Sequence, residues 1–149
     1  MQLFRTAFAG FVLATATATA LTAQPAGVTP PEDVFIEVSR ADGSISLSTD
    51  AVSLARGAYY RLNFVCLPEG GEPEFSFDVA RLVRDSHLRV LTVENIEVYL
   101  QGLSFRAIQC EGPGNARFSF YPMRTGAYQI EVTDDEGDSV SAFVTVSVD

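Results

Sequence analysis

Two adjacent runs of alternating apolar and polar residues lie within Arg117–Val132, and a short Pro-to-Gly segment separates them. Side chains of a β-strand point alternately to opposite faces, so each run predicts a strand with one buried face. The inward positions are Phe118, Phe120, Tyr128, Ile130 and Val132. The short separation predicts that the two strands form a hairpin.

The same pattern recurs along the chain between Gly- and Pro-rich turns. The further predicted strands are 34–38, 45–47, 58–66, 74–77, 88–93, 96–100, 103–110 and 140–148. Residues 111–115 are predicted to form a turn. Residues 78–86 are the one stretch with helical spacing, and Asp78 can cap a short helical turn there. Many short strands at close spacing predict an all-β, Greek-key β-sandwich with one short helical turn.

The first residues have the composition of an export signal. Arg5 precedes a short apolar run, and small residues up to Ala23 offer cleavage sites, so residues 1–23 are expected to be a signal peptide. Residues 24–31 contain three prolines and are expected to be a linker, followed by one domain over 32–149. The apolar run is too short for a membrane span, and the mature protein is expected to be periplasmic or secreted.

The formal net charge of -9 restricts the possible partners. An acidic surface repels phosphate backbones, which argues against nucleic acid as a partner and leaves a cation or another exported protein.

Cys66 and Cys110 are the two cysteines of the chain. An even count in an exported protein favours a disulfide between them. The alternative is that both are buried thiols, because each continues the inward phase of its strand.

Three segments together resemble the cupredoxin-like domains of exported bacterial proteins. Leu54–Leu62 resembles the entry into a strand of that family. Phe120–Tyr128 resembles its Phe-x-Pro…Gly-x-Tyr motif, and the valine-rich final strand is also similar. The stretch from Leu82 to Leu103 is similar to one exported branch of the family. The resemblance implies a cupredoxin-like sandwich.

In copper-binding members, a Cys, a His and usually a Met follow the Gly-x-Tyr strand, and a further His precedes a mid-chain strand. In this sequence Val132 stands at the cysteine position, Asp135 at the histidine position, and Pro73–Glu74 where the mid-chain histidine is expected. Thiolate and imidazole ligands build a blue-copper centre, so the sequence predicts that this centre is absent.

Other candidate chemistry is sparse. His87, the single histidine, has the setting of an ordinary surface residue, but Cys66, Cys110, Met123 and His87 are the soft ligands that an atypical copper site would use. The acidic segment 134–138 is either a weak calcium loop or a solvated turn. Phe143, with Tyr59 and Tyr99, is a candidate for an exposed aromatic surface.

No nucleophile–base arrangement or phosphate-binding loop is recognisable, so no catalytic or cofactor-binding residue is predicted. The sequence therefore favours a non-catalytic binding or interaction module without a cofactor. The alternative is a metal-handling protein with copper at the atypical soft-ligand site.

Overall fold

The computed structural model describes residues 29–68, 74–101, 104–134 and 140–149. These residues form nine strands and one short helix. The elements are β1 (Glu32–Ala41), β2 (Ser44–Leu47), β3 (Ala51–Leu54), β4 (Tyr60–Cys66), β5 (Glu74–Asp78), α1 (Ala80–Arg84), β6 (Ser86–Gln101), β7 (Ser104–Pro122), β8 (Gly126–Asp134) and β9 (Ser141–Val148). The signal peptide predicted over 1–23 lies outside the described residues.

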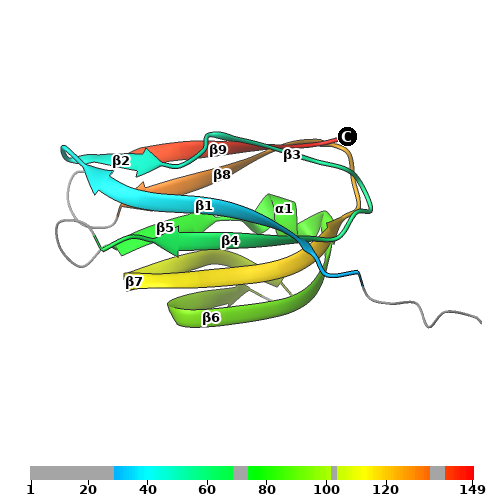
Figure 1. Ribbon diagram of the computed structural model, residues 1–149, viewed down its shortest axis with the longest axis horizontal. Coiled ribbons are helices and arrows are strands. Elements are labelled where there is room, and N and C mark those ends of the chain that lie inside the picture. Colours follow the sequence, from blue (N-terminus) through cyan, green and yellow to red (C-terminus); the bar gives the residue numbers. More distant parts are fainter. Residues whose placement is uncertain (1–28, 69–73, 102–103, 135–139) are drawn as a thin grey trace, which may run out of the picture.

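The strands form two layers that share the long β6–β7 pair (Figure 1). In the first layer β2, β1, β4 and the second half of β7 are neighbours, and in the second layer the first half of β7 is followed by β5, β8, β9 and β3. β1 pairs with β4 in parallel, as β3 does with β9, and the other pairs are antiparallel. β7 lies between the sequential strands β4 and β5, a crossover typical of Greek-key sandwiches. The predicted all-β sandwich is therefore confirmed.

The hairpin predicted from Arg117–Val132 is wrong. β8 pairs with β5 and β9 and not with β7, so the segment between Pro122 and Gly126 carries the chain from one layer to the other. Both runs form strands with one buried face, as the alternation predicted. The two strands lie in different layers, however, so their apolar faces meet across the core and the strands are not neighbours in one sheet.

β7 is a single bent strand where the sequence predicted a strand, a turn and another strand. Residues 107–111 pair with β5 and residues 114–120 pair with β4, so the change of layer falls at the predicted turn, 111–115. Gly112 has a φ of 107°, which a residue without a Cβ adopts readily. β6 follows β7 through both layers and is likewise one strand, with irregularities in register between Leu88 and Val90 and between Glu94 and Ile96.

Aromatic residues from both layers fill the core. Phe64 of β4 packs on Phe77 of β5 with 4.5 Å between ring centroids, and Phe105 meets Phe118 from the other half of β7 at 5.3 Å. The largest fully buried side chains are Phe64, Phe75, Phe77, Phe118, Phe120, Ile36, Leu62, Leu82, Ile108, Ile130, Val38 and Val79. The inward positions predicted from the alternation are all buried.

The helical prediction is confirmed in shortened form. α1 is five residues long, and Asp78 accepts a hydrogen bond from the backbone N–H of Ala80 at 3.0 Å, close to its expected capping role. Leu82 and Val83 bury one side of α1, while Arg81 and Arg84 face solvent. In the part of the chain that the structure describes, no helix has the length and apolar character needed to cross a membrane.

Candidate functional site

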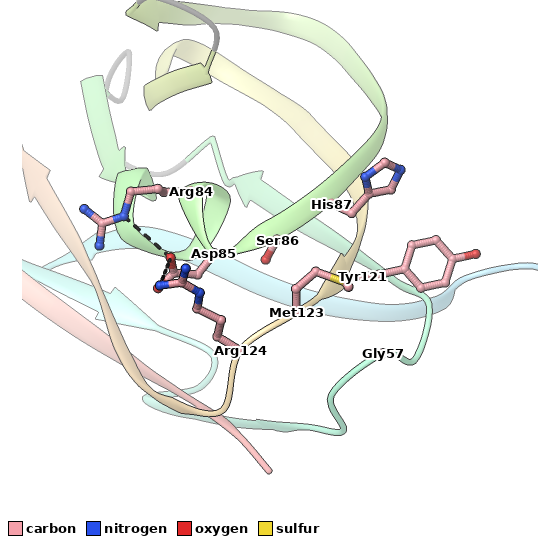
Figure 2. A pocket seen from close by; sticks show the side chains of 8 residues that line it. All are labelled: Gly57, Arg84, Asp85, Ser86, His87, Tyr121, Met123 and Arg124. Atoms are coloured by element: carbon pink, nitrogen blue, oxygen red, sulfur yellow. Dashed lines mark ion pairs between the residues drawn. The ribbon is translucent and has the colours of Figure 1, made fainter.

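A cavity of about 510 Å³ lies where the end of α1, the start of β6 and the β7–β8 connection meet (Figure 2). We call it the arginine pocket. Its lining residues are Gly57, Arg84, Asp85, Ser86, His87, Tyr121, Met123 and Arg124. This volume falls within the range typical of small-molecule sites.

Backbone hydrogen bonds hold the walls of the arginine pocket together. The N–H of Met123 donates to the carbonyl of Asp85 at 3.0 Å, which fixes the β7–β8 connection against the end of α1. On the other side, the N–H of Gly57 donates to the carbonyl of Pro122 at 2.8 Å. The pocket is therefore built by three segments that are far apart in sequence.

Two arginines share one carboxylate at the rim of the pocket (Figure 2). Arg84 Nε and Arg124 Nη1 lie 3.6 and 3.7 Å from Asp85 Oδ1. The Asp85 side chain is 16% exposed, whereas the two arginine side chains are mostly exposed. The carboxylate also accepts a hydrogen bond from the Tyr128 hydroxyl at 3.3 Å. Burial, and then the charge of Asp85, raises the pKa of Tyr128 above its ordinary value.

Polar and apolar groups both face the arginine pocket. The buried Ser86 Oγ has no hydrogen-bond partner among the described residues, and Met123 is 55% exposed.

Tyr59 and Tyr121 form one stacked pair beside the arginine pocket. Their ring centroids are 4.6 Å apart, with an angle of 11° between the planes. The Tyr59 hydroxyl donates to Ser119 Oγ at 3.0 Å, and the His87 ring lies 6.4 Å from the Tyr121 ring. These contacts fix the orientation of Tyr121, which forms part of the pocket wall.

A second hollow of about 180 Å³ lies on the other side of the tyrosine pair. We call it the sheet groove. It is lined by Pro31, Tyr59, Arg61, Val90, Thr92, Arg117 and Ser119. Tyr59 belongs to this groove and Tyr121 to the arginine pocket, so the stacked pair separates the two hollows.

Arg61, one of the two arginines that line the sheet groove, forms a bidentate pair with a neighbouring carboxylate. Arg61 donates from Nε and Nη2 to the two oxygens of Asp33, both at 2.6 Å, and Asn63 Nδ2 donates to the same carboxylate at 2.9 Å. The hydrogen bonds from Arg61, followed by the one from Asn63, lower the pKa of Asp33 to about 2.

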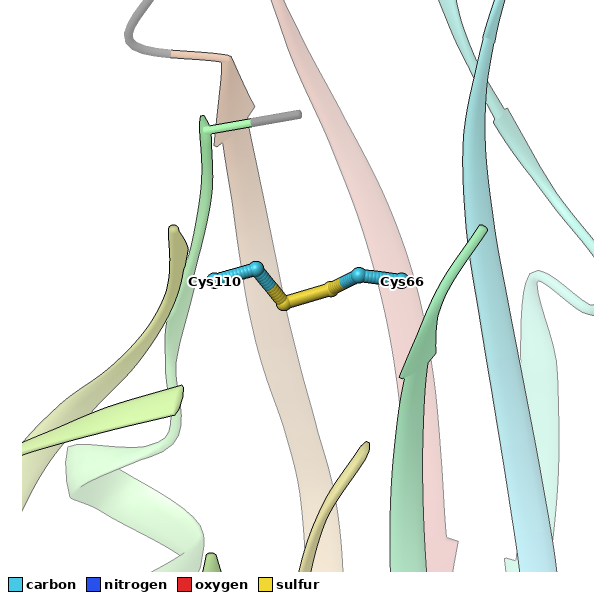
Figure 3. The surroundings of a disulfide bond; sticks show 2 residues. All are labelled: Cys66 and Cys110. Atoms are coloured by element: carbon cyan, nitrogen blue, oxygen red, sulfur yellow. A yellow bond between two sulfur atoms is a disulfide. The ribbon is translucent and has the colours of Figure 1, made fainter. Parts of the chain in front are cut away.

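The four predicted soft ligands do not come together. Cys66 and Cys110 form a disulfide between the end of β4 and the first half of β7, as one of the two alternatives predicted (Figure 3). His87 and Met123 instead line the arginine pocket. His87 pairs with Tyr121 at the far end of β7, so the histidine and the disulfide lie toward opposite ends of that strand.

The donor set does not fit a blue-copper centre. Neither cysteine is free to supply a thiolate, and Val132, which the sequence resemblance assigned to the cysteine position, is fully buried opposite Phe77 and Ala142. Among the residues that the structure describes, no group of three His, Cys, Asp or Glu side chains is placed to hold a metal ion.

The acidic segment 134–138 is described only at its first residue. Asp134 is not a solvated turn residue: it ends β8, is 7% exposed and forms an ion pair with Arg40 of β1, in which Arg40 Nε donates to Oδ2 at 2.7 Å. The other four residues, including Asp135, which the sequence resemblance assigned to the histidine position, lie outside the described residues.

Of the three candidates for an exposed aromatic surface, Phe143 is exposed. Phe143 is 47% exposed on the outer face of β9. Tyr59 is partly buried by its stack with Tyr121, and the side chain of Tyr99 lies outside the described part.

Sequence reasoning missed the arginine pocket itself. Arg84 and Asp85 lie at the end of α1, Tyr121 lies near the end of β7, and Arg124 lies in the β7–β8 connection, which was wrongly predicted to be a hairpin. One available signal was composition: the sequence has no lysine, and three of its ten basic residues, Arg81, Arg84 and Arg124, fall in α1 or in the Pro-to-Gly segment.

Comparison with solved structures places this architecture among the cupredoxin-like folds. The chain is similar to Fet3p, described as a multicopper oxidase that functions in iron import, with a TM-score of 0.53 and 10% sequence identity over 83% of this chain and 29% of that one. It is also similar to auracyanin B (TM-score 0.47, 13% identity, 81% of this chain and 91% of that one). A third similar structure is the blue copper oxidase of Nitrosomonas europaea (TM-score 0.46, 10% identity, 84% and 46%).

The likeness to Fet3p supports the fold alone, and this chain spans less than a third of the length of that oxidase. No known protein family and no curated protein matches the sequence. The class defined here is therefore an all-β sandwich of the cupredoxin type with a disulfide between its layers.

Proposed function

We propose that this protein is an exported, non-catalytic binding module that uses the surface around the Tyr59–Tyr121 pair to hold a ligand or a partner protein. The observation that carries the proposal is that two hollows, each lined by two arginines, meet at this one oriented pair. Aromatic and arginine side chains are enriched at binding surfaces because they combine large contact area with directed hydrogen bonds. The disulfide supports export, since such bonds persist in oxidising compartments.

Nuclear magnetic resonance with a mixed set of small acids, bases, neutral aromatics and sugars tests this proposal. We expect at least one chemical class to shift the resonances of residues that line the two hollows. Tyr121→Leu should weaken that binding, whereas Phe143→Leu, which changes an exposed aromatic on β9, should not. Perturbations confined to other surfaces would contradict the proposal, as would turnover of ester, phosphate or glycan substrates by the purified protein.

A second candidate is a metal-handling protein that binds monovalent copper. It is favoured by the presence of both His87 and Met123 in the arginine pocket, since imidazole and thioether groups are ligands for this ion. The two bonded cysteines cannot contribute thiolates to it. Titration with monovalent copper against a competing chelator, on the wild type and on His87→Ala/Met123→Leu, distinguishes the candidates, because only a copper protein would lose affinity in the variant.

A further inference from the structure

We infer that the arginine pocket recognises a carboxylate attached to an apolar or aromatic body. The inference rests on the proposed binding function and specifies the chemistry of one of its two hollows. It follows from the charge of the pocket, the unused donors of its arginines and the apolar wall opposite them.

The charge around the pocket is opposite to that of the whole chain. Arg84 and Arg124 face a single carboxylate, that of Asp85, at the rim. Arg81 lies one helical turn before Asp85 and forms no ion pair within the described residues. The chain as a whole carries a formal charge of -9. An anion is repelled by most of this protein and attracted to this end of it.

The two arginines of the arginine pocket keep hydrogen-bonding capacity that Arg61 of the sheet groove has already used. Arg61 makes two bonds of 2.6 Å with Asp33, which is a closed bidentate pair. In contrast, Arg84 and Arg124 approach Asp85 only at 3.6 and 3.7 Å, too long for good hydrogen bonds. A guanidinium carries five N–H donors in a planar fork that matches a carboxylate, so these two side chains are equipped to bind one.

The remaining walls favour a monoanion with an apolar body. Ser86 Oγ is buried without a partner in the described structure, and a hydroxyl can bond a ligand oxygen. Tyr121, held in place by Tyr59, and the exposed side chain of Met123 offer an aromatic ring and a thioether for apolar contact. Asp85 at the rim disfavours more highly charged anions such as phosphate.

Titration of the ¹⁵N-labelled protein with N-acetylphenylalanine, its uncharged amide and inorganic phosphate tests the inference. We expect saturable shifts from the acid at Ser86, His87, Met123 and the arginine Nε–H groups, and binding of the amide and of phosphate at least tenfold weaker. Arg84→Gln/Arg124→Gln should weaken binding of the acid at least tenfold. Arg106→Gln is the matched control, because Arg106 is also exposed and lies 3.7 Å from a carboxylate, that of Asp78, outside the pocket.

Two outcomes overturn the inference: equal affinity for the acid and the amide, and unchanged affinity in the double variant. If neutral or basic probes shift the residues around Tyr121 while acids do not, the carboxylate inference fails and the proposed binding function stands. If no probe shifts either hollow, both fail. A peptide with a C-terminal phenylalanine that binds more tightly than N-acetylphenylalanine identifies the chain end of a partner protein as the source of the carboxylate, and the reverse order identifies a small molecule.

Discussion

Cys66 is the last residue of β4, and its disulfide to Cys110 joins the two layers of the sandwich. Cys66 pairs with Val38 and Gly114 on the neighbouring strands, and Cys110 pairs with Phe75 and Ile96. The disulfide therefore spans the core and does not join two paired strand residues. Both cysteines are almost fully buried, and their Cα atoms are 6.6 Å apart.

Replacing both cysteines by alanine should lower the free energy of unfolding by about 2–4 kcal/mol. The reason is that the bond closes a long loop, with 44 residues of sequence separation, and restricts the unfolded chain. Urea unfolding of the wild type and of Cys66→Ala/Cys110→Ala measures the difference. Wild-type protein unfolded under reducing conditions is the control, and equal midpoints for the oxidised and reduced wild type would contradict the prediction.

The ion pair of Asp33 and Arg61 should make the stability of the protein depend on pH in the acidic range. The pKa of Asp33 is lowered to about 2 from 3.8, so the folded state binds the proton less readily than the unfolded state. The contribution of this carboxylate is therefore fully present above pH 3.8 and is lost as the pH falls through about 2. The Asp33 carboxyl resonance should titrate in that range, and in Arg61→Gln its pKa should move back toward 3.8.

The variant Asp33→Asn controls for the other acids of this protein. Its stability at neutral pH should be lower than that of the wild type, and its loss of stability on acidification should be smaller. Parallel acid unfolding curves for the two proteins would show that Asp33 is not linked to folding.

Tyr128 should make the protein sensitive to alkali. Its pKa is raised above 10.0, first by burial and then by the charge of Asp85, so the folded state retains the phenolic proton longer than the unfolded state. Stability from this group is complete below pH 10.0 and is lost as the pH rises through the folded-state pKa. The urea midpoint of Tyr128→Phe should therefore fall less than that of the wild type as the pH is raised above 10.0.

The fold class was predictable because it depends on local pattern. Period-two alternation identified the inward residues on both sides of the core, such as Phe118 and Ile130, and these residues are fully buried. The pairing of strands was not predictable in the same way. Alternation states which face of a strand is buried but not which strand lies beside it, and the short Pro-to-Gly segment suits both a hairpin and a crossing between layers.

The candidate site was less predictable than the fold. The disulfide could be anticipated from an even number of cysteines in a chain expected to be exported, whereas the inward phase of both cysteines suited buried thiols. The arginine pocket depends on how the end of α1 meets the β7–β8 connection, where Met123 N–H bonds the carbonyl of Asp85. That contact joins residues 38 positions apart in the sequence, and no local pattern encodes it.

Addition of divalent copper should give no intense thiolate-to-copper absorption in the red part of the visible spectrum. That band requires a cysteine thiolate bound to copper, and both sulfur atoms of cysteine are joined in the disulfide. Val132, which the sequence resemblance assigned to the cysteine position, is fully buried. Cys66→Ala/Cys110→Ala should show the same spectrum as the wild type. An intense band in the wild type that disappears in this variant would show that the cysteines reach copper and that the ligand argument is wrong.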